Sequence, residues 1–81
     1  MKARVFVSFK STVLDPQGQT ICSKLRDLGY PAIADVRQGK FFDIALADGL
    51  TPEKARQDIE TIAYEVLANP VIEEYRVELI D

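Results

Sequence analysis

The sequence predicts a single α+β domain in which an antiparallel sheet carries two helices. Stretches with the two-residue period of a strand stand near both ends and in the middle of the chain. Between them lie two proline-marked helix starts, Asp-Pro at residues 15–16 and Thr-Pro at residues 51–52. With 81 residues there is room for one domain, which we expect to cover residues 1–81.

The first strand and the first helix are predicted from local pattern. Residues 3–9 place small or apolar side chains at every second position: Ala3, Val5, Val7 and Phe9. Asp15 is a predicted N-cap, and Pro16 suits the first helical position, where its missing N–H would have no partner. Ile21, Leu25 and Leu28 follow at helical spacing, and Gly29 favours the left-handed conformation that ends a helix.

The middle of the chain predicts a hairpin over residues 30–47, with RQGK at residues 37–40 as its turn. In the second arm Phe42, Ile44 and Leu46 share one face, opposite Phe41, Asp43 and Ala45. The first arm is less regular, because Ile33 and Val36 are three residues apart and share a face only across a bulge.

The second helix begins after the predicted cap Thr51, and an apolar stripe runs along it: Ala55, Ile59, Ile62, Ala63, Val66 and Leu67. Pro70 disfavours helical geometry at Asn69, so the helix ends there. A last strand then begins, with Tyr75, Val77 and Leu79 on one face.

The predicted element order is therefore that of a ferredoxin-like βαββαβ two-layer sandwich, an antiparallel sheet with two helices on one face. If the faces that carry Val5 and Ile44 meet the helices, four apolar side chains remain on the uncovered face: Phe6, Phe41, Ala45 and Ile80. Such a patch among charges usually marks an interface, so we expect self-association through these residues, as a homodimer or homotetramer.

Composition excludes several classes of function. A net charge of -3 disfavours a nucleic-acid partner, since phosphates require Lys or Arg. No apolar run approaches membrane-spanning length, and no secretion signal is evident, so a cytoplasmic location without a membrane partner is expected. The absence of histidine disfavours a metal site and Ser-His or Cys-His catalysis. The lone Cys22 is interpreted as a buried helical thiol.

The charged motifs are better explained by structure than by catalysis. Asp15 in DPQG is interpreted as a helix cap rather than part of a phosphate cradle, because the Gly-Lys-Ser/Thr signature is missing. RQGK is the one compact basic cluster, so Arg37, Gly39 and Lys40 are candidates for an anion or a partner's carboxylate, although hairpin turns often carry solvated cations. The carboxylates near the C-terminus are expected to be solvated: Glu73, Glu74, Glu78 and Asp81.

Four motifs, with Lys10 before them, together resemble the PurS family: VLDPQG at residues 13–18, LGY at 28–30, VRQGK at 36–40 and LANPVIEEYRVEL at 67–79. They occur in the family's order and spacing over almost the whole chain. The resemblance implies the small, non-catalytic subunit of phosphoribosylformylglycinamidine (FGAM) synthase in purine biosynthesis. PurQ releases ammonia from glutamine, PurL uses ATP and Mg²⁺ to convert formylglycinamide ribonucleotide (FGAR) to FGAM, and PurS holds both together and assists ammonia transfer.

The resemblance also adds site candidates. Asn69, Tyr75 and Arg76 become candidate partner contacts beside Arg37, Gly39 and Lys40, and we favour a protein surface as the ligand of the RQGK segment. Gln38 departs from the VRVGK-like versions of this segment. No cofactor is expected on this subunit. The alternative is an ACT-like regulatory module that binds an amino acid, which is disfavoured because residues 8–18 offer glycine only at Gly18.

Overall fold

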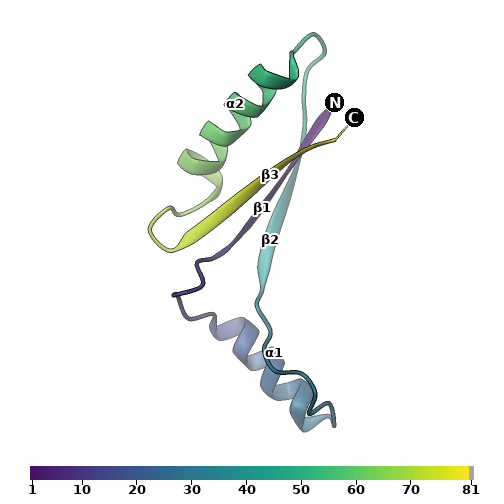
Figure 1. The fold of residues 1–81 in the computed structure, drawn as a ribbon, viewed down its shortest axis with the longest axis vertical. Coiled ribbons are helices and arrows are strands. Elements are labelled where there is room, and N and C mark those ends of the chain that lie inside the picture. The colour runs from purple at the N-terminus through teal and green to yellow at the C-terminus, as the bar shows by residue number, and fades with distance from the viewer. Residues whose placement is uncertain (81) are drawn as a thin grey trace.

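A computed structural model describes residues 1–80, so the predicted solvated carboxylate of Asp81 lies outside the described residues. The fold is α+β and agrees with the ferredoxin-like class (Figure 1). In chain order the elements are β1 (Lys2–Phe9), α1 (Pro16–Asp27), β2 (Gly39–Ala45), α2 (Pro52–Ile62), a π-helical turn η1 (Ala63–Leu67) and β3 (Glu73–Ile80).

The three strands form an antiparallel sheet with β1 in the centre, in the order β2-β1-β3. Phe6 on β1 lies opposite Phe41 on β2 and Arg76 on β3. Directly opposed residues share a face of the sheet, so this register separates the two faces as the sequence predicts. Lys2 in turn lies opposite both Ala45 and Ile80, which places them on the same face as Phe6.

The core lies between the sheet and α2. Val5, Val7 and Ile59 are at most 1% exposed, and four more side chains complete this core: Ala3, Ala63, Ala68 and Val77. Burial of these apolar groups is the main stabilising contribution in this part of the molecule.

Both helices begin at the predicted caps. Asp15 accepts the N–H of Gly18 at 3.0 Å, and Thr51 accepts that of Lys54 at 3.2 Å. Gly29 ends α1 with φ +99°, in the left-handed region that glycine adopts without steric cost.

The predicted apolar stripe of the second helix is wrong at Ile62 and Val66, which are 38% and 73% exposed. Val66 lies in the π turn η1, in which the N–H of Ala68 donates to the carbonyl of Ala63, five residues back, at 2.9 Å, whereas Ile62 precedes this turn and lies at the end of α2. This wider turn changes the phase of the stripe, so that Ala63 and Ala68 are buried and Val66 faces outward.

The first arm of the predicted hairpin is not a strand. Residues 33–38 have no strand pairing, and RQGK leads into β2 instead of forming a hairpin turn. Side chains satisfy part of this backbone: Arg26 donates to the carbonyls of Ile33 and Ala34 at 3.1 and 2.8 Å. The three-residue spacing of Ile33 and Val36 fits this irregular path better than the two-residue period of a sheet.

A third difference from the prediction concerns the helix layer. Both helices were expected to cover one face of the sheet, but α2 lies along the sheet while α1 extends beyond its end (Figure 1). We call α1 together with residues 28–38 the arm, and the sheet together with α2 and η1 the body. The arm gives the molecule an elongated shape, with extents of 51 × 27 × 14 Å. Among residues 1–80, no helix is long and apolar enough to span a membrane.

Candidate functional site: the open face of the sheet and the clasp

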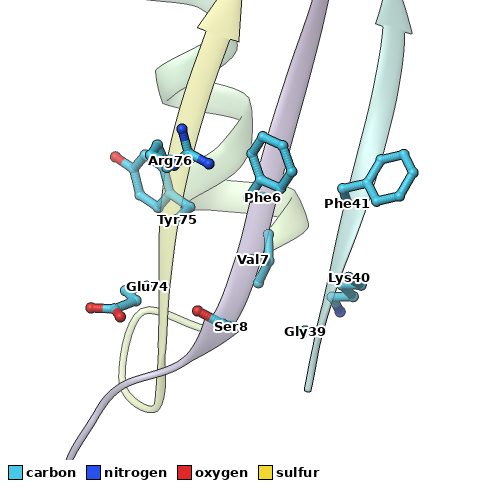
Figure 2. Close-up of a pocket in the computed structure, with 9 residues that line it drawn as sticks. All are labelled: Phe6, Val7, Ser8, Gly39, Lys40, Phe41, Glu74, Tyr75 and Arg76. Carbon is cyan, nitrogen blue, oxygen red and sulfur yellow. The ribbon is translucent and has the colours of Figure 1, made fainter. Parts of the chain in front are cut away.

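The face of the sheet opposite α2 is the first candidate contact surface, and we call it the open face. At its centre Phe6 lies between Arg76 on β3 and Phe41 on β2 (Figure 2). Phe41 is 56% exposed, and Phe6 is half-buried. Adjacent aromatic side chains that remain accessible on a sheet face are typical of a surface that a partner covers.

Two arginines hold the aromatic rings of the open face in place. The guanidinium of Arg76 lies 4.5 Å from the ring centre of Phe6, and that of Arg4 lies 5.0 Å from that of Phe41. The two rings are 6.1 Å apart and tilted by 44°. These cation–π and aromatic contacts restrict the side chains before any partner arrives, which reduces the entropy lost on binding.

Each arginine of the open face also has a carboxylate partner. Arg4 donates to Asp43 through Nε at 2.7 Å and through a terminal nitrogen at 3.2 Å, and Arg76 pairs with Glu78. The hydrogen bond from Arg4 is the main reason why the pKa of Asp43 is lowered, and the same pair raises the pKa of Arg4. The open face therefore presents neutralised ion pairs around its aromatic centre.

An open hollow of about 610 Å³ lies on this part of the sheet (Figure 2). Gly39 contributes no side chain to it, and a Cβ there would lie 2.7 Å from the carbonyl oxygen of Val7. The hollow is bordered by the aromatic pair and by charges of both signs, including Arg76 and Glu74. Its lining suits a protein side chain as well as a small anion.

The structure brings part of the candidate partner residues together at the hollow, and their side chains contact different groups. The guanidinium of Arg37 donates to the carbonyls of Lys10 and Val13 at 3.1 and 3.0 Å, while the ammonium of Lys40 lies 5.7 Å from the ring centre of Phe42. The two cations of RQGK thus contact different groups.

The candidates from the C-terminal motif also contact different groups. The side chain of Asn69 accepts the N–H of Val71 at 3.1 Å, and the backbone N–H of Asn69 donates to the carboxylate of Glu73 at 2.7 Å, so Asn69 forms the turn before β3. Tyr75 packs against the core, whereas Arg76 is on the open face. Of the six candidates, Gly39, Lys40, Tyr75 and Arg76 line the hollow together with Phe6 and Phe41 (Figure 2), whereas Arg37 and Asn69 are not among its lining residues.

A second feature, which sequence reasoning missed, joins DPQG to RQGK. Asp15 is only 2% exposed, and besides capping α1 it accepts the N–H of Gln38 at 2.6 Å. We call Asp15, Gly18, Arg37 and Gln38 the clasp. The N–H of Gln38 and then that of Gly18 lower the pKa of Asp15, burial opposes this shift, and the charge of Arg37 adds to the lowering.

The clasp explains two residues of the motifs. A Cβ at Gly18 would collide with the carbonyl oxygen of Val36 and lie 2.6 Å from Oδ2 of Asp15, so glycine is required there. Gln38 donates from its side chain to that of Gln17 and adds a contact across the clasp. A hydrogen bond between residues 23 positions apart leaves no local sequence pattern, so no signal in the sequence predicted it.

Comparison with known proteins identifies the relatives of this fold. Residues 2–81 match the family described as PurS, phosphoribosylformylglycinamidine (FGAM) synthase. The chain belongs to the PurS family. It is 40% identical over 82 residues to the phosphoribosylformylglycinamidine synthase subunit PurS of Bacillus subtilis strain 168, covering 96% of this chain and 90% of the relative. The PurS resemblance is thus confirmed, and the ACT-like alternative is not favoured.

Solved PurS structures share the fold along nearly the full chain. The structure of PurLQS from Thermotoga maritima contains a chain that matches with a TM-score of 0.87 and 33% identity, covering 98% of this chain and 95% of the other. The PurS of Methanocaldococcus jannaschii matches with a TM-score of 0.84 and 36% identity, covering 99% and 98%. The elongated arrangement of arm and body therefore belongs to a fold that PurS proteins share.

Proposed function

We propose that this chain is the small subunit of FGAM synthase and that it bridges a glutaminase subunit, PurQ, and a synthetase subunit, PurL. The observation that carries the proposal is the likeness to a chain in the structure of PurLQS, which covers 98% of this chain. In the proposed complex, ammonia released from glutamine converts FGAR to FGAM with ATP and Mg²⁺, and this subunit assists ammonia transfer. A cytoplasmic location follows from this role.

We infer that the subunit contributes binding surface and no catalytic group, and that it binds no cofactor itself. The two carboxylates with lowered pKa, Asp15 and Asp43, accept hydrogen bonds from groups that hold the fold together. Within residues 1–80, no group of three or more potential metal ligands gathers. These observations support a non-catalytic role.

Self-association is the second part of the proposal. In the arm, Ile21 and Leu28 are 41% and 65% exposed, although they lie on the apolar side of α1. On the body, the predicted oligomer interface of Phe6, Phe41, Ala45 and Ile80 lies on the open face. Two exposed apolar surfaces on a chain of this size favour a homodimer or homotetramer, which would remove both from water.

Light scattering coupled to size-exclusion chromatography tests the proposal. The chain alone is expected to elute as a dimer or tetramer, and with PurL, PurQ, glutamine and MgADP it is expected to enter one larger complex. Omission of the chain should abolish glutamine-driven FGAM formation and leave most of the ammonia-driven reaction. A monomer that joins neither partner contradicts the proposal, and loss of the ammonia-driven reaction contradicts a pure bridging role.

A further inference from the structure

The arm is joined to the body by two segments, residues 10–15 leading out and residues 36–39 leading back. Because α1 extends away from the sheet, the orientation of the arm depends on how these two segments are held together (Figure 1). Two side chains link them: Asp15 accepts the N–H of Gln38, and Arg37 donates to the carbonyls of Lys10 and Val13. The joint between arm and body is therefore a set of polar contacts with little apolar packing.

Within the arm, the returning segment is held against α1 at two places. Arg26 binds the carbonyls of Ile33 and Ala34, and Gly18 allows the carbonyl of Val36 to approach closely. Cys22, which is 7% exposed, lies between these two places on α1. The arm is thus one unit, and the clasp at its base is the point about which it would turn.

We infer that Asp15 is a positioning residue for assembly. By capping α1 and accepting the N–H of Gln38 together, its carboxylate fixes the orientation in which the arm presents Ile21 and Leu28 to a second copy of this chain. Assembly with PurL and PurQ then follows from the correctly formed oligomer, and both self-association and this last step rest on the proposed function. Asp15 acts through backbone N–H groups and contacts no reacting group.

The chemistry of the clasp requires a carboxylate. A helix cap alone is served equally well by Asn, Ser or Asp, because one oxygen acceptor suffices. Asp15 uses one oxygen for Gly18 and the other for Gln38, and among side chains of this size only an ionised Asp offers two separate acceptor oxygen atoms. Asp15→Asn therefore retains the shape and the cap but places an N–H₂ group against one of the two N–H donors.

The sole cysteine reports on the clasp, since Cys22 lies beside the returning segment at residues 34–35. The reaction of its thiol with an aromatic disulfide reagent should be roughly ten-fold faster in Asp15→Asn, the change expected for one lost hydrogen bond to a charged group. Thr51→Ala is the matched control. It removes the side chain that caps α2, and this side chain accepts a hydrogen bond from Lys54 of its own helix and does not link two segments. In that variant the rate should stay within about two-fold.

Assembly is measured on the same proteins. Asp15→Asn should lower the oligomer fraction in light scattering and the glutamine-driven rate with PurL and PurQ, while the ammonia-driven rate and the far-UV circular dichroism persist. Equal thiol rates in Asp15→Asn and wild type, equal increases in both variants, or a faster thiol with unchanged assembly would each overturn the inference. Failure of the wild-type chain to join PurL and PurQ contradicts the proposed function alone, because the thiol assay and self-association are measured without those partners.

Discussion

The body and the arm of this molecule are stabilised in different ways. The body holds the deeply buried apolar side chains around Val5, Val7 and Ile59, whereas in the described part of the arm the one buried apolar side chain is Cys22, which is 7% exposed. The arm is instead held by polar contacts to backbone groups, from Asp15, Arg26 and Arg37. Because hydrophobic stabilisation scales with buried apolar area, the body contributes more of it to the fold than the arm does.

The largest effect on the free energy of unfolding is expected from a substitution in the body. Ile59 is 1% exposed, so Ile59→Ala should lower the free energy of unfolding by about 2–5 kcal/mol through lost burial and a residual cavity. Leu28→Ala in the arm, at a residue that is 65% exposed, should change it by less than about 0.5 kcal/mol. Urea unfolding at a protein concentration that favours the monomer measures both. Similar losses in the two variants would show that the arm already has a core of its own.

The next effect concerns two glycines of the arm. Gly18→Ala must displace the backbone of Val36, and we expect it to cost about 1–3 kcal/mol and to increase the reactivity of the Cys22 thiol. Gly29→Ala has free space around it, but its φ of +99° costs about 1–2 kcal/mol locally and should leave the thiol unchanged. Thermal unfolding combined with the thiol reaction separates the two. An unreactive thiol in Gly18→Ala would mean that the returning segment is held without the clasp.

A smaller effect on stability, but a clear one on assembly, is expected on the open face. Phe41→Ala removes the exposed ring between Arg4 and Phe6, and should weaken self-association at least about ten-fold, as loss of a central aromatic contact does. Val71→Ala, at a residue that is 77% exposed beside β3, is the control and should have little effect. Sedimentation equilibrium gives both dissociation constants. Equal values for Phe41→Ala and wild type would exclude the open face as the oligomer interface.

The difference between local and long-range contacts explains which parts of the molecule could be predicted from the sequence. The caps at Asp15 and Thr51, the faces of β1 and β2, and the end of α1 at Gly29 depend on neighbouring residues and were predicted correctly. The segment before RQGK, with Ile33 and Val36, was expected to pair as a strand, but residues 33–38 instead contact the side chains of Arg26 and Asp15.

The π turn and the outward direction of the arm also have no local pattern. Both are set by contacts that form only in the folded chain, such as the hydrogen bond from Ala68 to Ala63 and the contact of Asp15 with Gln38. The candidate site likewise has one part that follows from local sequence pattern and one part that does not. The shared face of Phe6 and Phe41 follows from strand period and register, whereas nothing in RQGK indicated that Arg37 would bind the carbonyls of Lys10 and Val13.

The smallest effect is a dependence of both regions on pH. Asp15 in the clasp and Asp43 on the open face have lowered pKa values, because each ionised carboxylate accepts hydrogen bonds in the folded state. An unfolded Asp has a pKa of about 3.9. The contributions of both carboxylates to the free energy of unfolding are therefore complete above that pH and are lost as the pH falls through the lowered pKa values of the folded state. Acidification should therefore release the arm through Asp15 and loosen the open face through Asp43.

Titration of the Gln38 and Gly18 amide signals by NMR should give an apparent pKa below that of an unfolded Asp, and Asp15→Asn should abolish this transition. A transition at or above the ordinary Asp value would mean that the carboxylate of Asp15 is not held by these two N–H groups in solution, and that the arm is positioned by other contacts.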